Sequence, residues 1–365
     1  MAAVLECCDA ETAHPAVNPL HAIGWPKGGG DDDWWHLLHV HPQARPARVA
    51  EQHRSGYRVV ESAHDEPAPV QSPPDWQRPQ ADPQQRAVVG DWVLVEGDGA
   101  TARIVALLPR RTAIRRAAAG EHYRQQYIAA NIDTVLILCG LDGDFNPRRI
   151  ERYLLLVADS GAQPVVVLTK ADHADADVPA ARASLVEVIT QGVPVVALDA
   201  RDASTATVLA PWLQSGQTAV LVGSSGAGKS TLTNTLLGRR QMKTAGVREH
   251  DARGRHTTTY RALLALPSGA CLIDTPGMRE LKPTGEESLQ DPYGDVEALA
   301  ADCRFRDCRH HDEPGCAVVA AVATGSLSAD RHRHYLKLRD EVQQAAQRKS
   351  ARQAGDDTRP RGGRR

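Results

Sequence analysis

The sequence predicts a circularly permuted α/β domain, and three observations lead to this fold class. Two apolar runs of strand length, residues 133–138 and 163–168, flank an amphipathic segment of helical spacing at 148–158, so a strand, a helix and a strand follow one another. A Thr-Lys-Ala-Asp segment at 169–172 comes directly after the second run. A glycine-rich phosphate loop, Gly-Ser-Ser-Gly-Ala-Gly-Lys-Ser, comes later, at 223–230. Nucleotide-binding domains of ordinary connectivity place this loop first, so the reversed order indicates permuted connections between the same strands.

The apolar runs are continuous rather than alternating, which is typical of parallel strands covered by helices on both faces. Further strands of this kind are expected at 193–198, 218–222 and 270–273. We therefore expect the α/β domain to occupy residues 129–290.

Length and composition limit the class of protein. The chain has 365 residues, 42% hydrophobic and 24% charged, which is enough for two or three domains. A net charge of -2 gives no overall reason to expect a nucleic-acid partner, and seven cysteines without a disulfide framework fit a reducing compartment. No apolar run approaches the roughly 20 residues that cross a bilayer, and the first residues lack a signal-peptide pattern. We expect a soluble, cytoplasmic protein with no membrane partner.

The first 43 residues have the composition of a poorly ordered extension. Glycines at 28–30, aspartates at 31–33 and isolated apolar residues show no packing period. We therefore expect residues 1–43 to be an appendage of the folded part.

Short alternating runs between residues 44 and 118 predict a small OB-like β-barrel. The runs lie at 48–50, 57–61, 91–96 and 103–108, separated by turn signals and by a proline-rich stretch at 67–83. The basic residues that follow the last run are Arg110, Arg111, Arg115 and Arg116. They form either a positive barrel edge that meets phosphate backbone or a solvated segment leading into a linker at 119–128.

The phosphate loop lies between an expected strand and an expected helix at 231–237, which is the context that a nucleoside triphosphate site requires. Its glycines let backbone amides face the phosphates, Lys229 reaches the terminal phosphates, and the Ser230 hydroxyl binds Mg²⁺. The residues expected to hold the nucleotide here are Gly223, Ser224, Ser225, Gly226, Ala227, Gly228, Lys229, Ser230 and Thr231.

Asp274 follows the apolar run at 270–273, so its carboxylate is expected at the carboxyl end of a strand, where ligands bind in open α/β sheets. There it would hold the hydration shell of Mg²⁺. The amide of Gly277, three residues later, would meet the γ-phosphate.

We expect the segment at 169–172 to recognise the base of the nucleotide. The Asp172 carboxylate can accept hydrogen bonds from the ring N–H and the exocyclic amine of guanine, a pair of donors that adenine lacks, which favours GTP over ATP. Lys170 would lie along the base, and Thr169 would line the same site. The alternative is that this segment is just a polar turn after a strand.

The segment at 254–259 lies between the phosphate loop and Asp274, where a switch loop would supply Thr257 or Thr258 to Mg²⁺ and the γ-phosphate. A polar exposed loop is the alternative. Residue 278 is Met278, which cannot orient an attacking water. His256 is the nearest candidate for that role, so the hypothetical catalytic set is His256, Thr258 and Lys229.

Three cysteines and a histidine, Cys303, Cys308, His310 and Cys316, form a complete Cys₃His set for one structural Zn²⁺. His311 is a less favoured alternative ligand. Helices are expected at 317–323 and 330–347, the second with one basic side, which gives a zinc-binding helical domain at 291–347. Residues 348–365 are expected to be a basic disordered tail that can contact RNA phosphates.

With these motifs in place, residues 44–345 resemble the ribosome small-subunit-dependent GTPase A family. The resemblance rests on the two nucleotide motifs, on G-R-H-T-T at 254–258, on D-T-P-G-M at 274–278 and on C-R-F-R-D-C-R-H-H-D-E-P-G-C at 303–316. It implies GTP hydrolysis stimulated by the small ribosomal subunit, contact with its rRNA and a role in its late maturation.

The same resemblance makes His256 the match of the family's proposed catalytic histidine. Thr169 departs from the common asparagine, which puts the contact to guanine N7 in doubt. We expect the protein to act as a monomer.

Two other function classes fit parts of the chain. A P-loop kinase of small-molecule metabolism would turn over without RNA, but the barrel and zinc segment argue against it. An RNA-binding protein with a structural or weakly active nucleotide site would release no γ-phosphate, but Lys229, Ser230 and Asp274 argue against that.

Overall fold

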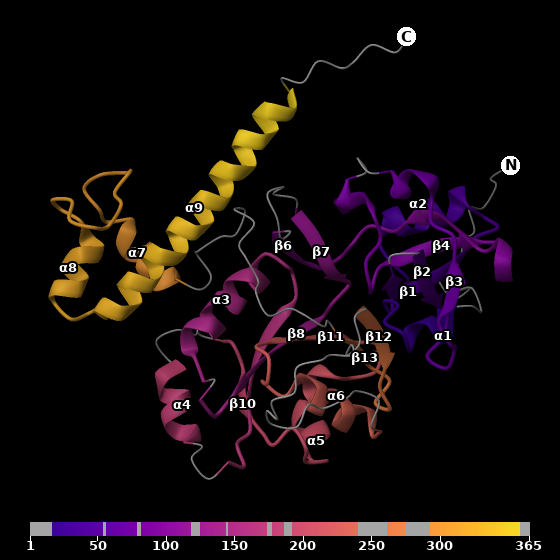
Figure 1. The fold of residues 1–365 in the computed structure, drawn as a ribbon, viewed down its shortest axis with the longest axis horizontal. Coiled ribbons are helices and arrows are strands. Elements are labelled where there is room, and N and C mark those ends of the chain that lie inside the picture. Colours follow the sequence, from indigo (N-terminus) through magenta and orange to yellow (C-terminus); the bar gives the residue numbers. More distant parts are fainter. Residues whose placement is uncertain are drawn as a thin grey trace, which may run out of the picture.

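The computed structural model describes residues 17–53, 56–78, 82–117, 125–143, 145–173, 177–185, 192–239, 261–274 and 293–357. Figure 1 shows a central α/β part, with a mostly β part on the N-terminal side and a helical part that ends in the long helix α9. The expected order of a β part, an α/β part and a helical part is therefore present.

Five parallel strands form the α/β sheet in the order β10-β9-β8-β11-β13. Their bounds are β8 Thr134–Gly140, β9 Gln163–Thr169, β10 Val195–Ala197, β11 Thr218–Gly223 and β13 Cys271–Asp274. The associated helices are α3 Pro147–Ala158, α4 Val178–Leu185, α5 Thr205–Leu209 and α6 Lys229–Leu237. Each strand predicted from a continuous apolar run is confirmed, because runs buried on both faces keep their signature in the sequence.

The N-terminal β part has five strands, β1 Arg45–His53, β2 Gly56–Val60, β3 Ala68–Val70, β4 Trp92–Glu96 and β5 Arg103–Leu107. Antiparallel pairing runs β3-β2-β1-β4-β5, and a parallel bridge between Gln71 and Arg103 joins the two ends into a ring. Strand β3 was not predicted, because it lies inside the proline-rich stretch, where Pro69 hides a short strand. Short 3-10 helices lie at Pro74–Gln77, Pro83–Gln85, Gly99–Thr101 and Ala210–Trp212.

Strand β12, Arg261–Ala265, joins the N-terminal β part and the α/β sheet into one continuous sheet. It pairs antiparallel with β13 on one side and with β1 on the other, where Ala262 lies opposite Glu51. The sequence did not predict this strand. Its pairing with β13 is a local hairpin, whereas its pairing with β1 joins distant parts of the chain, so a local pattern cannot reveal the continuous sheet.

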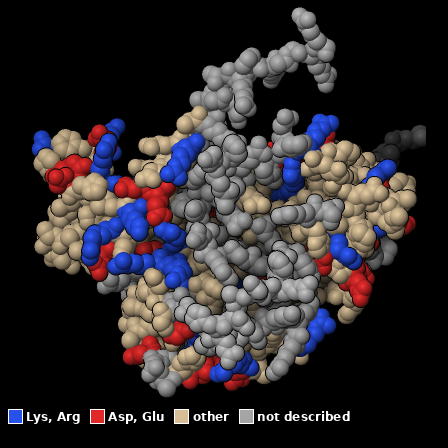
Figure 2. Space-filling view, in the orientation of Figure 1, with Lys and Arg blue, Asp and Glu red and all other residues tan. Residues whose placement is uncertain are grey.

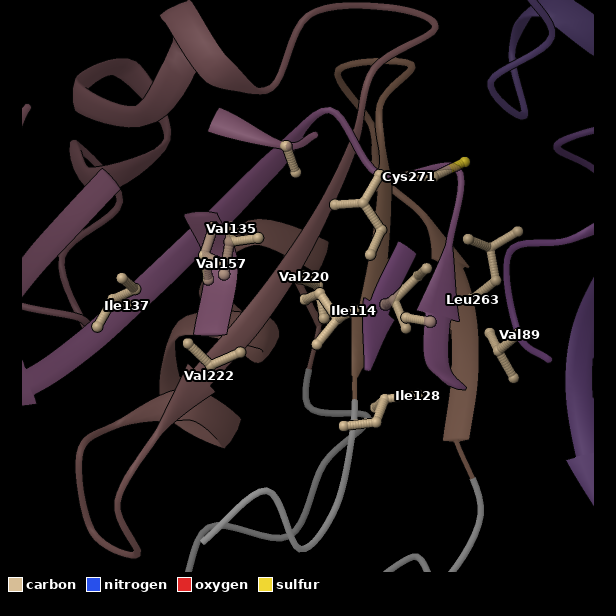
Figure 3. Close-up of a cluster of buried hydrophobic side chains, with 14 of the residues drawn as sticks. Val89, Ile114, Ile128, Val135, Ile137, Val157, Val220, Val222, Leu263 and Cys271 are labelled. Atoms are coloured by element: carbon tan, nitrogen blue, oxygen red, sulfur yellow. The ribbon is translucent and has the colours of Figure 1, made fainter. Parts of the chain in front are cut away.

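The expectation that residues 119–128 form a linker is wrong for residues 125–128, the part that the structure describes. Residues 125–128 begin β7, Gln125–Ala130, which pairs with β6, Ala113–Ala117, in a separate hairpin. Ile114 and Ile128 of this hairpin are buried with sheet residues such as Val220, as Figure 3 shows. The hairpin is thus a packed element between the ring of strands and the α/β sheet, and residues 118–124 lie outside the described residues.

The arginine cluster after β5 does not form the uniform positive edge that was one interpretation. Arg110 forms an ion pair with the fully buried Asp91 at 2.7 Å, and its guanidinium lies 4.1 Å from the ring centre of Tyr127. Burial raises the pKa of Asp91, against the opposing effect of Arg110. Arg110 therefore belongs to the interior.

The expected poorly ordered extension is also wrong for the residues that the structure describes there. Helices α1, Val17–His21, and α2, Asp32–Val40, lie against the ring of strands. Trp25 and Trp34 are both 1% exposed, and the ring centre of Trp25 lies 4.7 Å from that of Trp92. Isolated tryptophans without a period do not reveal burial in the sequence, yet each removes a large apolar area from water. Residues 1–16 lie outside the described part.

Arg48 of β1 ties these regions together. Its fully buried guanidinium donates hydrogen bonds to the Thr218 hydroxyl and the Asn131 carbonyl, both at 2.8 Å, and to the carbonyls of Gly90 and Ile23. Burial lowers the pKa of Arg48. A buried cation is tolerated only when its donors are satisfied, and here the acceptors come from four separate segments.

The helical part contains α7 Gly294–Ala300, α8 Ala317–Ala323 and α9 Ala329–Asp357. The expectation of a disordered tail from residue 348 is wrong up to residue 357, because Ala, Gln, Lys and Arg sustain a helix. Residues 358–365 lie outside the described part. No helix among the described residues has the length and apolar character needed to cross a membrane.

The predicted basic side of α9 is only partly a surface. Arg339 is 9% exposed and lies over Tyr335, and Arg331 is bound to the carboxylates of Asp295 at 2.6 Å and Glu151 at 3.3 Å. Glu151 belongs to α3, so this ion pair fastens the helical part to the α/β domain. Leu155 of α3 lies in the apolar core of the helical part and strengthens the same junction.

Candidate nucleotide site and metal centre

The two nucleotide motifs meet at the carboxyl edge of the sheet, on either side of β8. In the parallel register, Gly140 at the end of β8 lies opposite Thr169, and Leu138 lies opposite Gly223. Because neighbouring parallel strands end at the same edge, the order of the motifs along the chain does not alter their meeting point. The sequence-predicted convergence of these two segments is present in the structure.

The phosphate loop runs from the end of β11 to the start of α6, as its motif predicts. A Cβ at Gly223 would lie 2.4 Å from the Leu138 carbonyl oxygen, and Gly228 has a left-handed φ of 89°, so both positions require glycine. The Lys229 ammonium donates to the carbonyl oxygens of Gly223 at 2.7 Å and Ser224 at 2.5 Å. The Lys229 ammonium therefore lies against the phosphate loop, where the terminal phosphates of a nucleotide are expected to bind.

Thr169 connects the two motifs directly. Its hydroxyl donates a hydrogen bond of 2.9 Å to the carbonyl of Ala227 in the phosphate loop, and its side chain is fully buried. The sequence placed Thr169 at the base, in doubtful contact with guanine N7. In the structure, Thr169 braces the phosphate loop against the segment at 169–172.

Lys170 adopts a left-handed φ of 60°, and its ammonium forms an ion pair with Asp142 in the loop after β8. A Cβ at Gly140 would lie 2.8 Å from the Asp142 carboxylate and 3.3 Å from Lys170, so Gly140 leaves room for this pair. No sequence pattern marks Asp142 as a site residue, because its partner lies in a different loop.

Asp172, the expected guanine reader, lies on the surface of the same edge with its carboxylate bound to Arg201. Arg201 also reaches Asp199 at 3.2 Å, in the loop after β10. Burial works against the charge of Asp199, but the hydrogen bonds and charge of Arg201 hold the pKa of Asp199 below its ordinary value. Sequence reasoning did not single out Arg201, whose two partners lie in separate loops.

Ser230 and Asp274 are the expected Mg²⁺ residues. Ser230 is the second residue of α6, and Asp274 ends β13, the parallel neighbour of β11. A hydroxyl and a carboxylate are the hard oxygen donors that Mg²⁺ prefers, so the residues fit the ion. The remaining expected residues of the site lie outside the described residues, namely His256, Thr257, Thr258, Gly277 and Met278.

The predicted metal ligands come together in the helical part. The ligand atoms of Cys303, Cys308, His310 and Cys316 all lie within 4.8 Å of one another. His310 Nδ1 is 3.5 Å from both Cys303 Sγ and Cys316 Sγ, and these two sulfurs are 3.9 Å apart. Tetrahedral Zn²⁺ with ordinary bond lengths requires about 3.5 Å between S and N and about 3.8 Å between two S atoms. The geometry of these three ligands therefore fits zinc, and the sulfur of Cys308 lies within 4.8 Å of them.

The surroundings orient these ligands. The His332 Nε2 atom lies 2.7 Å from the His310 carbonyl, and the Glu313 carboxylate accepts from the amides of Arg309 at 2.9 Å and His311 at 3.0 Å. Backbone hydrogen bonds lower the pKa of Glu313 to about 2. Burial, and then the charge of Arg339, lower the pKa of His310, which favours the neutral imidazole that a metal binds. His310, and not the exposed His311, belongs to the cluster.

Comparison with known proteins places the chain in a family. The family model described as RsgA GTPase matches residues 107–284. A protein of Xanthomonas axonopodis pv. citri (strain 306), named small ribosomal subunit biogenesis GTPase RsgA, is 61% identical over 343 residues, or 93% of each chain. The chain belongs to the RsgA GTPase family. The relative of the same name in Xanthomonas campestris pv. campestris (strain B100) is 60% identical over the same length and share.

Two solved structures share the fold of this RsgA family member. YjeQ from Thermotoga maritima has a TM-score of 0.57 and 23% identity, over 82% of this chain and 98% of its own. YloQ, described as a circularly permuted GTPase, has a TM-score of 0.57 and 21% identity, over 84% and 97% of the two chains. The expected circularly permuted fold is therefore confirmed.

Proposed function

We propose that this protein hydrolyses GTP, binds the small ribosomal subunit and couples hydrolysis to the late maturation of that subunit. The observation that carries the nucleotide part is the hydrogen bond from Thr169 to Ala227, which joins the base-reading segment to the phosphate loop in one site. The ribosomal part is supported by the name of relatives that match 93% of the chain.

Each residue of the site has a distinct task in this proposal. Asp172 reads guanine after its carboxylate exchanges Arg201 for the base, and Lys229 moves from the loop carbonyls to the terminal phosphates. Ser230 and Asp274 hold Mg²⁺, which neutralises the developing phosphate charge when bound. We assign Thr258 to the same metal and His256 to the orientation of the attacking water.

The surrounding domains supply the RNA contacts in the proposal. We assign the ring of β1–β5 to an OB-like barrel. The order in which its strands pair and the parallel closure at Gln71 and Arg103 match a five-stranded closed barrel. We assign one structural Zn²⁺ to the Cys₃His cluster. The barrel and the zinc-binding part would contact rRNA, and the protein would act as a cytoplasmic monomer.

The decisive experiment measures phosphate release from GTP and from ATP, with and without purified small ribosomal subunits. We expect GTP to be preferred and the subunits to stimulate turnover, with Lys229→Ala reducing turnover roughly 100-fold or more. The exposed Arg239→Ala variant is the matched control and should behave as the wild type. A preference for ATP, or no stimulation, would overturn the proposal.

The same assay tests the assignment of His256. A His256→Ala protein should bind GTP and subunits normally and lose the stimulated rate. Full stimulated turnover in that variant would remove His256 from the mechanism and leave the rest of the proposal intact.

A further inference from the structure

A cavity of about 350 Å³ lies where α3 of the α/β domain meets α9 of the helical part. Its lining includes Asn146 and Arg148 from the start of α3, Ser184 from α4, and Asp330, Arg331 and His334 from α9. On the face in Figure 2, Lys and Arg side chains gather at this junction. None of the residues that line the cavity belongs to the phosphate loop, and no step of the proposed hydrolysis uses the cavity.

The cations at this junction fall into two groups. The first group is neutralised: Arg152 forms two 2.7 Å hydrogen bonds with Glu341, Arg333 pairs with Asp330, and Arg331 pairs with Asp295 and Glu151.

The second group consists of Arg148 and Lys337. Both side chains are exposed, and within the described residues neither forms a hydrogen bond or ion pair with a carboxylate. Arg148 acts on the buried Glu151 only through its charge, and both exposed side chains leave their hydrogen-bond donors available to an external anion.

His334 lies in the cavity among these cations. Its pKa is lowered first by burial and then by the charge of Arg148; Arg333 and Lys337 also lower it, and Asp330 opposes them.

We propose that this α3–α9 pocket, lined by Arg148 and His334 and flanked on α9 by Lys337, binds phosphate groups of an RNA backbone. The inference rests on the proposed function, in which RNA of the small subunit is the partner, and it names a contact surface for that RNA. Lys337 lies three residues beyond His334 on the same face of α9, so the cations continue past the cavity. A row of this kind fits an extended polyanion, whereas a compact phosphorylated metabolite would contact only the cavity.

The position of the pocket gives the contact a consequence. RNA bound there touches α3 and α9 together and so holds the helical part on the α/β domain. Helix α3 follows the loop that carries Asp142, the partner of Lys170 in the base-reading segment. Binding at the junction therefore stabilises the element that adjoins the nucleotide site.

Charge reversal in the full chain tests the inference. Arg148→Glu and Lys337→Glu should each weaken binding to purified small subunits about tenfold and reduce the slope of log affinity against log salt by about 0.7–0.9. Lys27→Glu reverses an equally exposed charge at a remote position and should change neither quantity. Arg148→Lys should retain binding, and intrinsic GTP hydrolysis and thermal stability should stay at wild-type values in all these proteins.

The outcomes separate this inference from the proposed function. If the wild-type protein itself fails to bind small subunits, the proposed function is wrong. If the wild-type protein binds and Arg148→Glu and Lys337→Glu bind no more weakly than Lys27→Glu, the α3–α9 pocket is not an RNA site and this inference is overturned.

Discussion

The metal centre and the nucleotide site differ in how far apart their residues lie in the chain. All four metal ligands fall within residues 303–316, whereas the hydrogen bond that joins the nucleotide motifs links residues 58 positions apart. A metal centre of this kind needs one loop and the start of one helix, since Cys316 also caps α8 by accepting from the Val319 amide. The nucleotide site needs the whole parallel sheet to bring its loops together.

Because of this difference, substitutions in the two sites should have different consequences. Loss of a ligand from the Cys₃His cluster affects a small domain, whose apolar core is limited in size. Loss of a nucleotide-site residue leaves a sheet whose large buried core is untouched. The following predictions test that contrast, from the largest expected effect to the smallest.

Cys316→Ser should have the largest effect, because it removes one of four ligands from the cluster that we assign to zinc, and structural zinc contributes about 10–16 kcal/mol in small zinc domains. We expect loss of stoichiometric zinc and rapid proteolysis of the helical part, with GTP affinity nearly unchanged. His311→Ala is the control and should keep its zinc, because His311 lies outside the cluster. Metal analysis and limited proteolysis measure both results, and equal loss of GTP affinity in Cys316→Ser would contradict the independence of the sites.

Arg331→Ala should destabilise the junction between the two domains by about 3 kcal/mol, because it leaves the 3% exposed Glu151 carboxylate buried without its ion-pair partner. Hydrogen exchange of α9 amides in the wild type and the variant measures this loss. Arg333→Ala is the matched control, since its ion pair with Asp330 is exposed and is worth about 0–1 kcal/mol. Similar exchange in the two variants would mean that the buried pair does not fasten the domains.

Asp172→Asn should weaken GTP binding about 10- to 100-fold, because hydrogen bonds to a charged group are worth about 1.5–3 kcal/mol. Xanthosine triphosphate should gain affinity in the variant, since an asparagine amide can donate to the carbonyl that replaces the exocyclic amine. The control is Asp202→Asn, which changes an exposed aspartate that caps the Ser204 amide. Titration with labelled nucleotides measures both affinities, and unchanged base preference would show that Asp172 is not the reader.

Thr169→Val should have the smallest of these effects, a cost of about 1–2 kcal/mol, because it leaves the Ala227 carbonyl without its buried donor. GTP affinity should fall about 5- to 30-fold, whereas zinc content should not change. Thr169→Ser keeps the hydroxyl and should bind GTP more tightly than Thr169→Val. Equal affinities in the two variants would mean that the hydroxyl does not brace the loop.

Much of the α/β domain was predictable because its signals are local. Continuous apolar runs marked β8, β9, β11 and β13, and the glycines of the phosphate loop are required by backbone geometry at that loop alone. The metal ligands were predictable for the same reason. Side-chain chemistry and spacing within one short segment specify them.

The errors have a common cause, which is dependence on distant partners. The pairing of β12 with β1 joins the two sheets, Trp34 is buried through contact with Trp92 and Trp25, and Asp142 reaches the site through its ion pair with Lys170. None of these relations leaves a period or a motif in its own segment. The extension and the linker were therefore assigned from composition alone, which cannot distinguish an exposed apolar residue from a buried one.

The amino-acid sequence alone is enough to specify a phosphate loop, the Thr-Lys-Ala-Asp segment at 169–172 and a Cys₃His cluster, because each consists of particular residue types at short spacing. Only the tertiary structure decided how these parts are joined, through the β1–β12 pairing, the buried Arg48, the brace from Thr169 to Ala227 and the α3–α9 junction. The physical reason is that local geometry and ligand chemistry act over a few bonds. Strand pairing and buried ion pairs depend on contacts between segments that only the folded chain brings together.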